Sequence, residues 1–193
     1  MQTIMNELFK QTYQTNPEKL YFSPGRVNII GGHTDYNGGA VLPFCIHKGI
    51  YGAIRFREDR LIRVYSENIS RKGILTFDLD HLEHDDQRDY ANYISGILYE
   101  LVKRDYRVDY GFDLVLSGNL PRGGGLSSSA ALLILVTKIV NDYCYLGLDG
   151  KQMALISKAV ENNYIGVACG IMDQFVIANG KQDMAIYLES ATL

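Results

Sequence analysis

The most informative stretch of the chain reads Gly118-Asn119-Leu120-Pro121-Arg122-Gly123-Gly124-Gly125-Leu126-Ser127-Ser128-Ser129-Ala130-Ala131. Its three consecutive glycines lack Cβ atoms, so their backbone N–H groups can approach an anion closely. The three serines that follow open an apolar run. The first turn of a helix presents free N–H groups and the positive end of the helix dipole. The stretch therefore predicts a phosphate-binding turn that leads into a helix.

A simpler interpretation of this stretch is a flexible turn followed by a serine that caps the helix. Two common nucleotide-binding patterns are excluded. No Gly-Lys-Ser/Thr follows, so the stretch is not a P-loop. The G-x-G-x-x-G spacing with a following acid is also absent, so it is not a dinucleotide-binding turn. Serine hydroxyls can add donors to a phosphate site or an oxygen ligand for Mg²⁺.

The composition around this stretch is that of one soluble globular domain. The 193 residues are 47% hydrophobic and 21% charged, which excludes a disordered chain. The net charge of −3 argues against a nucleic-acid or membrane-surface binder, and no apolar run is long enough for a transmembrane helix. The three cysteines show neither disulfide nor metal spacing. We expect reduced thiols and a cytoplasmic location.

Periodicity and turn residues predict an α+β fold, because helices and strands mix without a regular βαβ repeat. The predicted helices span 2–14, 91–104, 127–145 and 150–164. The predicted strands span 27–30, 49–57, 61–66, 74–78, 112–117 and 184–188.

A second glycine-marked segment covers residues 23–43. The short apolar strand at 27–30 runs into Gly31-Gly32, and His33, Thr34, Asp35, Tyr36 and Asn37 follow. These donors and acceptors suit a polyhydroxylated ligand held on a loop. A hairpin turn is an equal alternative, since Asn37-Gly38 alone is a good turn signal. Arg26, which precedes the strand, would by itself be solvated.

A third segment, residues 159–174, contains two acids in an apolar context. Asp173 is either a helix N-cap or a functional carboxylate. Glu161 lies near the end of the helix predicted for 150–164, where an acid opposes the helix dipole. Glu161 is therefore either a surface residue or a carboxylate with a compensating cation.

Together the three segments resemble the galactokinase family of the GHMP kinase superfamily. The first resembles G-R-V-N-x-I-G-x-H-T-D-Y-N-x-G, the second P-x-G-x-G-L-S-S-S-A, and the third C-G-I-M-D-Q. Their order and separations also fit, and the resemblance runs from Tyr21 to the end of the chain. It implies a GHMP kinase N-terminal domain over residues 1–193, with the mixed sheet and packed helices of the ribosomal protein S5 domain 2-like fold. It also implies phosphorylation of galactose by ATP and Mg²⁺ at the anomeric hydroxyl.

The resemblance also implies a role for individual residues. Asp173 would be the catalytic aspartate and Arg26 its partner. ATP would be bound by Gly123, Gly124, Gly125, Leu126, Ser127, Ser128 and Ser129, with Tyr90 stacked on adenine and Ser66 near the base. The sugar would be contacted by Gly32, His33, Asp35, Gly170 and Asp173. Mg²⁺ would be bound by Ser129 and Glu161.

Three departures from the family pattern affect these expectations. Gly32 stands where galactokinases have glutamate, which removes a sugar contact. Leu133 replaces another glutamate, to which we assign no role. The chain ends at Leu193, without the C-terminal domain that closes the cleft in relatives. We therefore expect weak ATP binding and little turnover by this chain alone. Two alternatives are a sugar kinase of altered specificity and a non-catalytic, sugar-sensing regulator.

Overall fold

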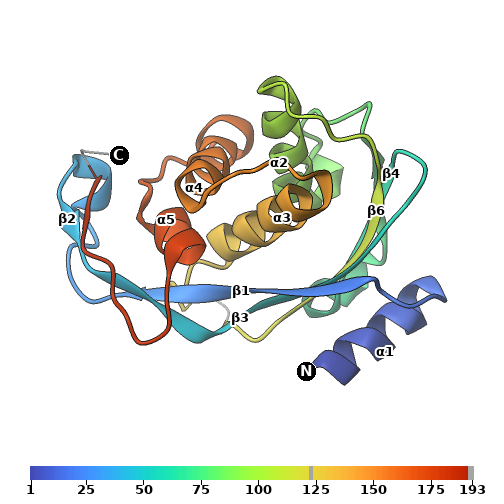
Figure 1. The fold of residues 1–193 in the computed structure, drawn as a ribbon, viewed down its shortest axis with the longest axis horizontal. Helices are drawn as coiled ribbons and strands as arrows, with labels where there is room; N and C mark the ends of the chain where they lie inside the picture. The colour runs from blue at the N-terminus through green and yellow to red at the C-terminus, as the bar shows by residue number, and fades with distance from the viewer. Residues whose placement is uncertain (122–123, 191–193) are drawn as a thin grey trace.

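Five strands form one mixed sheet in the order β1-β3-β6-β4-β5 (Figure 1). The computed structural model describes residues 1–121 and 124–190. The pairs β1–β3, β3–β6 and β4–β5 are antiparallel, and β4–β6 is parallel. The strands of this sheet are β1 (Lys19–Asn28), β3 (Pro43–Phe56), β4 (Leu61–Ser66), β5 (Leu75–Asp78) and β6 (Phe112–Gly118). A separate two-stranded ribbon pairs β2 (Ala40–Val41) with β7 (Leu188–Glu189).

Helices cover both faces of the sheet. Four pack together on one face, and α1 lies alone on the other (Figure 1). The α-helices are α1 (Gln2–Tyr13), α2 (Ala91–Lys103), α3 (Ser128–Cys144), α4 (Gly150–Ala159) and α5 (Met172–Asn179). The short helical turns are η1 (Asp35–Asn37), η2 (Glu67–Lys72), η3 (Asp86–Arg88) and the π-helical η4 (Val160–Ile165).

Alternation along the strands separates two buried layers. Ile54 and Leu114 belong to the main core with α2, α3 and α4, whereas Ala53 packs against α1. This is the period-two pattern expected when both faces of a sheet are covered. Helix α3 is apolar around most of its circumference because it lies at the centre of the main core. Leu133, one of the departures from the family pattern, is fully buried there.

The α+β prediction and the mixed sheet are confirmed. The elements expected at 2–14, 61–66, 91–104, 112–117 and 127–145 are present within two residues of their predicted ends. No helix in the described part of the chain combines the length and the apolar character needed to cross a bilayer. All three cysteines are unpaired.

Several elements differ from the sequence prediction. The strand expected at 49–57 is the longer β3, which begins at Pro43 and ends at Phe56. The strand expected at 27–30 is wrong: β1 runs through Pro24 and ends at Asn28, because a register shift between Pro24 and Arg26 accommodates the proline on an edge strand. The helix expected at 150–164 divides into α4 and the π-helical η4. The strand expected at 184–188 reduces to β7 and a bridge at Ala185. Helix α5 begins one residue before Asp173, which the sequence offers as an N-cap; the N-cap is instead Ile171, which makes no side-chain cap.

Candidate active site

Arg26 and Asp173 form a partly buried ion pair, although 147 positions separate them in the sequence. Nε and Nη2 of Arg26 both lie 2.7 Å from Oδ1 of Asp173. Nη1 of the same guanidinium donates to the carbonyl of Gly125 at 2.6 Å. The side chain of Arg26 thus connects β1 to the first turn of α5 and to the loop before α3 that contains Gly124 and Gly125, called the glycine-rich loop below. The N-cap interpretation of Asp173 is wrong, because its carboxylate faces Arg26 and the loop.

Ser127 contacts the other oxygen of the same carboxylate. Its hydroxyl donates to Oδ2 of Asp173, and it makes no side-chain cap on α3. The backbone of Ser127 is left-handed, with φ 57° and ψ 53°, a conformation that non-glycine residues seldom adopt. The start of α3 therefore has no side-chain cap and no acid in its first turn, as an anion-binding helix end requires.

Gly25 allows the glycine-rich loop to lie directly on β1. A Cβ atom at this position would come within 2.6 Å of Cδ2 of Leu120 and 2.9 Å of the carbonyl oxygen of Leu126. That carbonyl accepts a hydrogen bond from the backbone N–H of Arg26 at 3.3 Å. Glycine at position 25 therefore brings the loop and Arg26 into contact.

Asp35 holds the beginning of the helix that carries Asp173. Its carboxylate accepts hydrogen bonds from the backbone N–H groups of Ile171, at 3.3 Å, and Met172, at 3.1 and 3.2 Å. The hydroxyl of Ser190 donates to the same carboxylate at 2.9 Å. Asp35 is only 8% exposed, so most of its surface is used in this contact. A Cβ on Gly170 would lie 2.0 Å from Oδ2 of Asp35, which explains a glycine there.

Glu161 is a buried carboxylate whose partners are neutral. It is 6% exposed, on the π-helical turn η4. Its Oε2 accepts from Nε2 of Gln174 and from the thiol of Cys169, whose Sγ lies 3.5 Å away. Burial and the nearby Glu161 carboxylate raise the pKa of Cys169 to about 12, so the thiol keeps its proton at neutral pH.

The surroundings of Glu161 fit a divalent cation. Within residues 1–121 and 124–190, no Lys, Arg or His nitrogen forms a salt bridge with it. A buried carboxylate is costly without a compensating charge. Mg²⁺ typically takes one or two protein carboxylates and completes its shell with water and phosphate oxygens. The described residues contain no cluster of three or more metal-ligating acids, histidines or cysteines, so substrate phosphates and water would supply the remaining ligands.

The other expected sugar contacts are exposed beside Asp35. The side chains of His33 and Tyr36 are hydrogen-bonded, with Nδ1 of His33 2.8 Å from the phenolic oxygen of Tyr36. Gly32 is exposed and has no left-handed φ. A Cβ there would meet only Nδ2 of Asn28, at 3.6 Å. A larger side chain therefore fits at position 32 without backbone strain.

The two residues expected near the adenine base of ATP, Tyr90 and Ser66, are both buried. Tyr90 is 8% exposed in the main core, next to the backbone of Ser66, and Ser66 is also buried. Burial raises the pKa of Tyr90 to about 12. The two residues are thus neighbours, but the ring of Tyr90 presents little surface for stacking, so the arrangement does not support that expectation. Ser128 is exposed and Ser129 half-buried in the first turn of α3. Gly123 lies outside the described residues.

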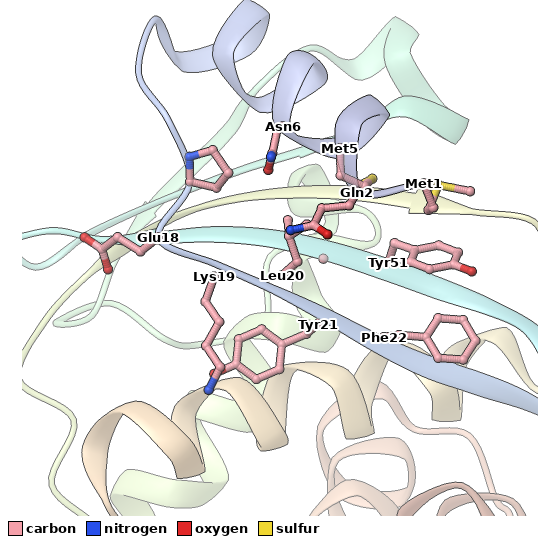
Figure 2. A pocket seen from close by; sticks show the side chains of 12 residues that line it. Met1, Gln2, Met5, Asn6, Glu18, Lys19, Leu20, Tyr21, Phe22 and Tyr51 are labelled. Atoms are coloured by element: carbon pink, nitrogen blue, oxygen red, sulfur yellow. The ribbon is translucent and has the colours of Figure 1, made fainter. Parts of the chain in front are cut away.

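A cavity of about 660 Å³ lies between α1 and the strands β1 and β3 (Figure 2). Phe22 and Tyr51 lie side by side at one end, with ring centroids 4.7 Å apart. None of the residues singled out from the sequence lines it. Its lining mixes apolar side chains with polar ones such as Gln2, Asn6 and Lys19, and the candidate active site lies elsewhere, where β1, the glycine-rich loop and α5 meet.

Sequence reasoning missed Gln174 and Asn162. Gln174 contacts Glu161 from within the core, and Oδ1 of Asn162 accepts from the backbone N–H of Cys169 at 3.0 Å. A signal for Gln174 was present, since it is an amide in the otherwise apolar run that follows Asp173. Its partner, 13 positions away on another helical segment, is visible only in the fold.

Comparison with known proteins agrees with this geometry. Residues 92–181 match the model of the GHMP kinases N terminal domain, and residues 7–56 match the galactokinase galactose-binding signature. The fold and the site thus define a GHMP kinase N-terminal domain. Within that superfamily, the chain belongs to the galactokinase family, whose N-terminal region it represents.

Relatives support this assignment over nearly the whole chain. Galactokinase from Levilactobacillus brevis is 45% identical over 185 residues, which are 96% of this chain and 48% of the relative. The crystal structure of Lactococcus lactis galactokinase complexed with galactose has a TM-score of 0.95 and 40% identity, and the match covers 100% of this chain and 50% of that one. Methanococcus jannaschii mevalonate kinase, 19% identical with a TM-score of 0.74, shares the fold. The chain spans about half the length of the curated relatives it matches.

Proposed function

We propose that this chain supplies the nucleotide- and sugar-binding half of a kinase that transfers the γ-phosphoryl group of ATP to the anomeric hydroxyl of galactose. The observation that carries the proposal is the carboxylate of Asp173, held by Arg26 and Ser127 where the glycine-rich loop enters α3. The galactose-binding signature over residues 7–56 supports galactose as the acceptor.

The chemistry follows from these contacts. Asp173 accepts or orients the proton of the sugar hydroxyl, and the guanidinium of Arg26 holds its carboxylate in place. The guanidinium also lies where it can stabilise charge on the transferred group. Residues Gly124 to Ser129 and the N–H groups at the start of α3 bind the ATP phosphates. Phosphoryl transfer depends mainly on such positioning and charge neutralisation, which this site provides without a covalent intermediate.

Magnesium completes the proposed site. Glu161 would hold it through its free oxygen, with the hydroxyl of Ser129 as the second protein ligand. When bound, Mg²⁺ neutralises the charge of the phosphate oxygens. Glu161 contributes a buried carboxylate. Since it has no salt bridge with any side chain that the structure describes, its negative charge can be compensated by the cation.

A second candidate, a kinase for another hexose, is favoured by Gly32. This position leaves space beside Nδ2 of Asn28, which a glutamate side chain would otherwise occupy. Galactose remains the leading proposal because the signature match covers this same segment.

We also propose a cytoplasmic location, supported by three unpaired cysteines. The partners would be small molecules, since a net charge of −3 does not favour nucleic acid or membrane surfaces. The curated relatives are about twice as long, and we propose that a region equivalent to their second half forms the other wall of the cleft.

The test is a ¹H–¹⁵N NMR titration of the 193-residue chain with Mg·AMPPNP, followed by galactose or, as the matched control, its C4 epimer glucose. We expect the nucleotide to shift the resonances of Gly124 to Ser129, and galactose but not glucose to shift those of His33 and Gly170. Nucleotide shifts confined to the cavity residues Met5, Phe22 and Tyr51 would contradict the proposal.

A further inference from the structure

Helix α5 directs two consecutive side chains to different parts of the site. Asp173 faces Arg26 and Ser127, whereas Gln174 contacts Glu161. Successive residues on an α-helix point about 100° apart, so one short helix can serve both groups. Because the carboxylate of Asp35 holds the start of this helix, the two contacts share one support.

The amide of Gln174 has only one orientation that suits its neighbour. Its Nε2 donates to Oε2 of Glu161 and lies 3.6 Å from Sγ of Cys169. The reverse orientation would place the amide oxygen against a carboxylate oxygen. Gln174 is 1% exposed, and its Oε1 has no hydrogen-bond partner. A buried acceptor without a partner is unfavourable, so an apolar side chain would fill this space better if filling it were the only role.

One oxygen of the Glu161 carboxylate, Oε2, is therefore held by hydrogen bonds, whereas the other, Oε1, has none from the described residues. Nε2 of Gln174 donates to Oε2, and Sγ of Cys169, which lies 3.2 Å from Oδ1 of Asn162, is 3.5 Å from the same carboxylate oxygen. Across the described ranges 1–121 and 124–190, no hydrogen bond reaches Oε1. A metal-binding carboxylate held in this way by an amide is the usual outer-shell arrangement, in which the partner orients the ligand.

We propose that Gln174 is a positioning residue that orients Glu161 so that Oε1 is presented to a divalent cation. This inference rests on the proposed function, which assigns the metal to Glu161.

The test measures metal affinity directly. Free Mn²⁺ is counted by electron paramagnetic resonance as the 193-residue chain is titrated in the presence of AMPPNP. Gln174→Met, which keeps the volume and removes the donor, is expected to weaken Mn²⁺ binding about tenfold. Its affinity for AMPPNP without metal should not change. The matched control Gln11→Met alters an exposed glutamine on α1 and should behave as wild type.

Two further variants make the outcome decisive. Glu161→Gln separates the proposed metal site at Glu161 from the proposed role of Gln174. If Glu161→Gln abolishes Mn²⁺ binding while folded Gln174→Met binds Mn²⁺ normally, only the role of Gln174 is overturned. If neither change affects Mn²⁺ binding, or if wild type binds none, the metal site itself is overturned as well. Should Gln174→Met melt below the assay temperature, Gln174→Asn decides instead. It keeps a buried amide on a side chain one carbon shorter, so the donor no longer reaches Oε2 and a similar loss of Mn²⁺ affinity is expected. Unchanged affinity there overturns the inference.

Discussion

The guanidinium of Arg26 holds the carboxylate of Asp173 on one side and the carbonyl of Gly125 on the other. The acid proposed to act on the sugar hydroxyl and the loop proposed to bind the phosphates are therefore aligned by a single side chain. Since the guanidinium is planar and rigid, the distance between loop and acid is set when β1 and α5 pack.

Asp173→Asn is expected to remove phosphoryl transfer while leaving the fold intact. The amide is isosteric but cannot accept the proton, and general-base roles contribute about 10²–10⁴ in rate. The measurement is a coupled ADP-release assay on the protein joined to the second half of a galactokinase relative. Asp86→Asn, on a fully exposed side chain, is the control. Turnover within threefold of the unsubstituted protein would contradict the role of Asp173.

Gly25→Ala is expected to push the glycine-rich loop away from β1. The added methyl would meet Leu120 and the backbone of Leu126, and such overpacking typically costs about 1–3 kcal/mol. Urea unfolding should show the loss of stability, and AMPPNP binding should weaken because Arg26 loses its contact with the loop. Gly32→Ala is the matched control, since its methyl meets only Asn28 at an ordinary distance. Equal effects at both positions would refute the argument.

Asp35→Ala is expected to lower the free energy of unfolding by about 1–3 kcal/mol, because it leaves buried donors at the start of α5 without an acceptor. Equilibrium urea denaturation measures this change. Asp86→Ala, which removes an exposed carboxylate, should stay near wild type. A result for Asp35→Ala inside the error of that control would show that its hydrogen bonds do not support the helix.

Gly32→Glu is expected to strengthen galactose binding without a loss of stability. The position is exposed and free of left-handed strain, so the side chain enters an open space. The new carboxylate would supply a sugar contact worth about 1.5–3 kcal/mol, or about tenfold or more in affinity. Isothermal titration with galactose and glucose measures it. If galactose affinity does not change, Gly32 is not the determinant of sugar selectivity.

The 193-residue chain alone is expected to turn over galactose at least about a hundredfold more slowly than Levilactobacillus brevis galactokinase. The chain spans about half of such relatives, and without a region equivalent to their second half the proposed site would leave the phosphoryl group exposed to water. A coupled assay on both proteins at equal concentration tests this. Comparable rates would mean that the residues described here suffice for catalysis.

Several features of the fold follow from local sequence, and others do not. The helix at 91–103 and the strand at 61–66 have clear periodicity, so their ends could be predicted closely. The strand predicted at 27–30 starts after Pro24 and Gly25, whereas β1 continues through both. Only the pairing with β3 shows that Pro24, which has no N–H to donate, lies on an edge strand. Helix α5 has its cap, Asp35, 136 positions away from Ile171, where no local signal can indicate it.

The sequence by itself determined the class of site: glycines followed by serines at a helix start, an arginine before a strand, and two acids in apolar surroundings. These are local properties, because backbone freedom, helix ends and side-chain chemistry depend on a few adjacent residues. Tertiary structure alone decided the partners. It brought Arg26 to Asp173, Asp35 to the start of α5, and Gln174 to Glu161, since burial of the α3 core forces distant segments together and each polar group must then find its hydrogen bonds there.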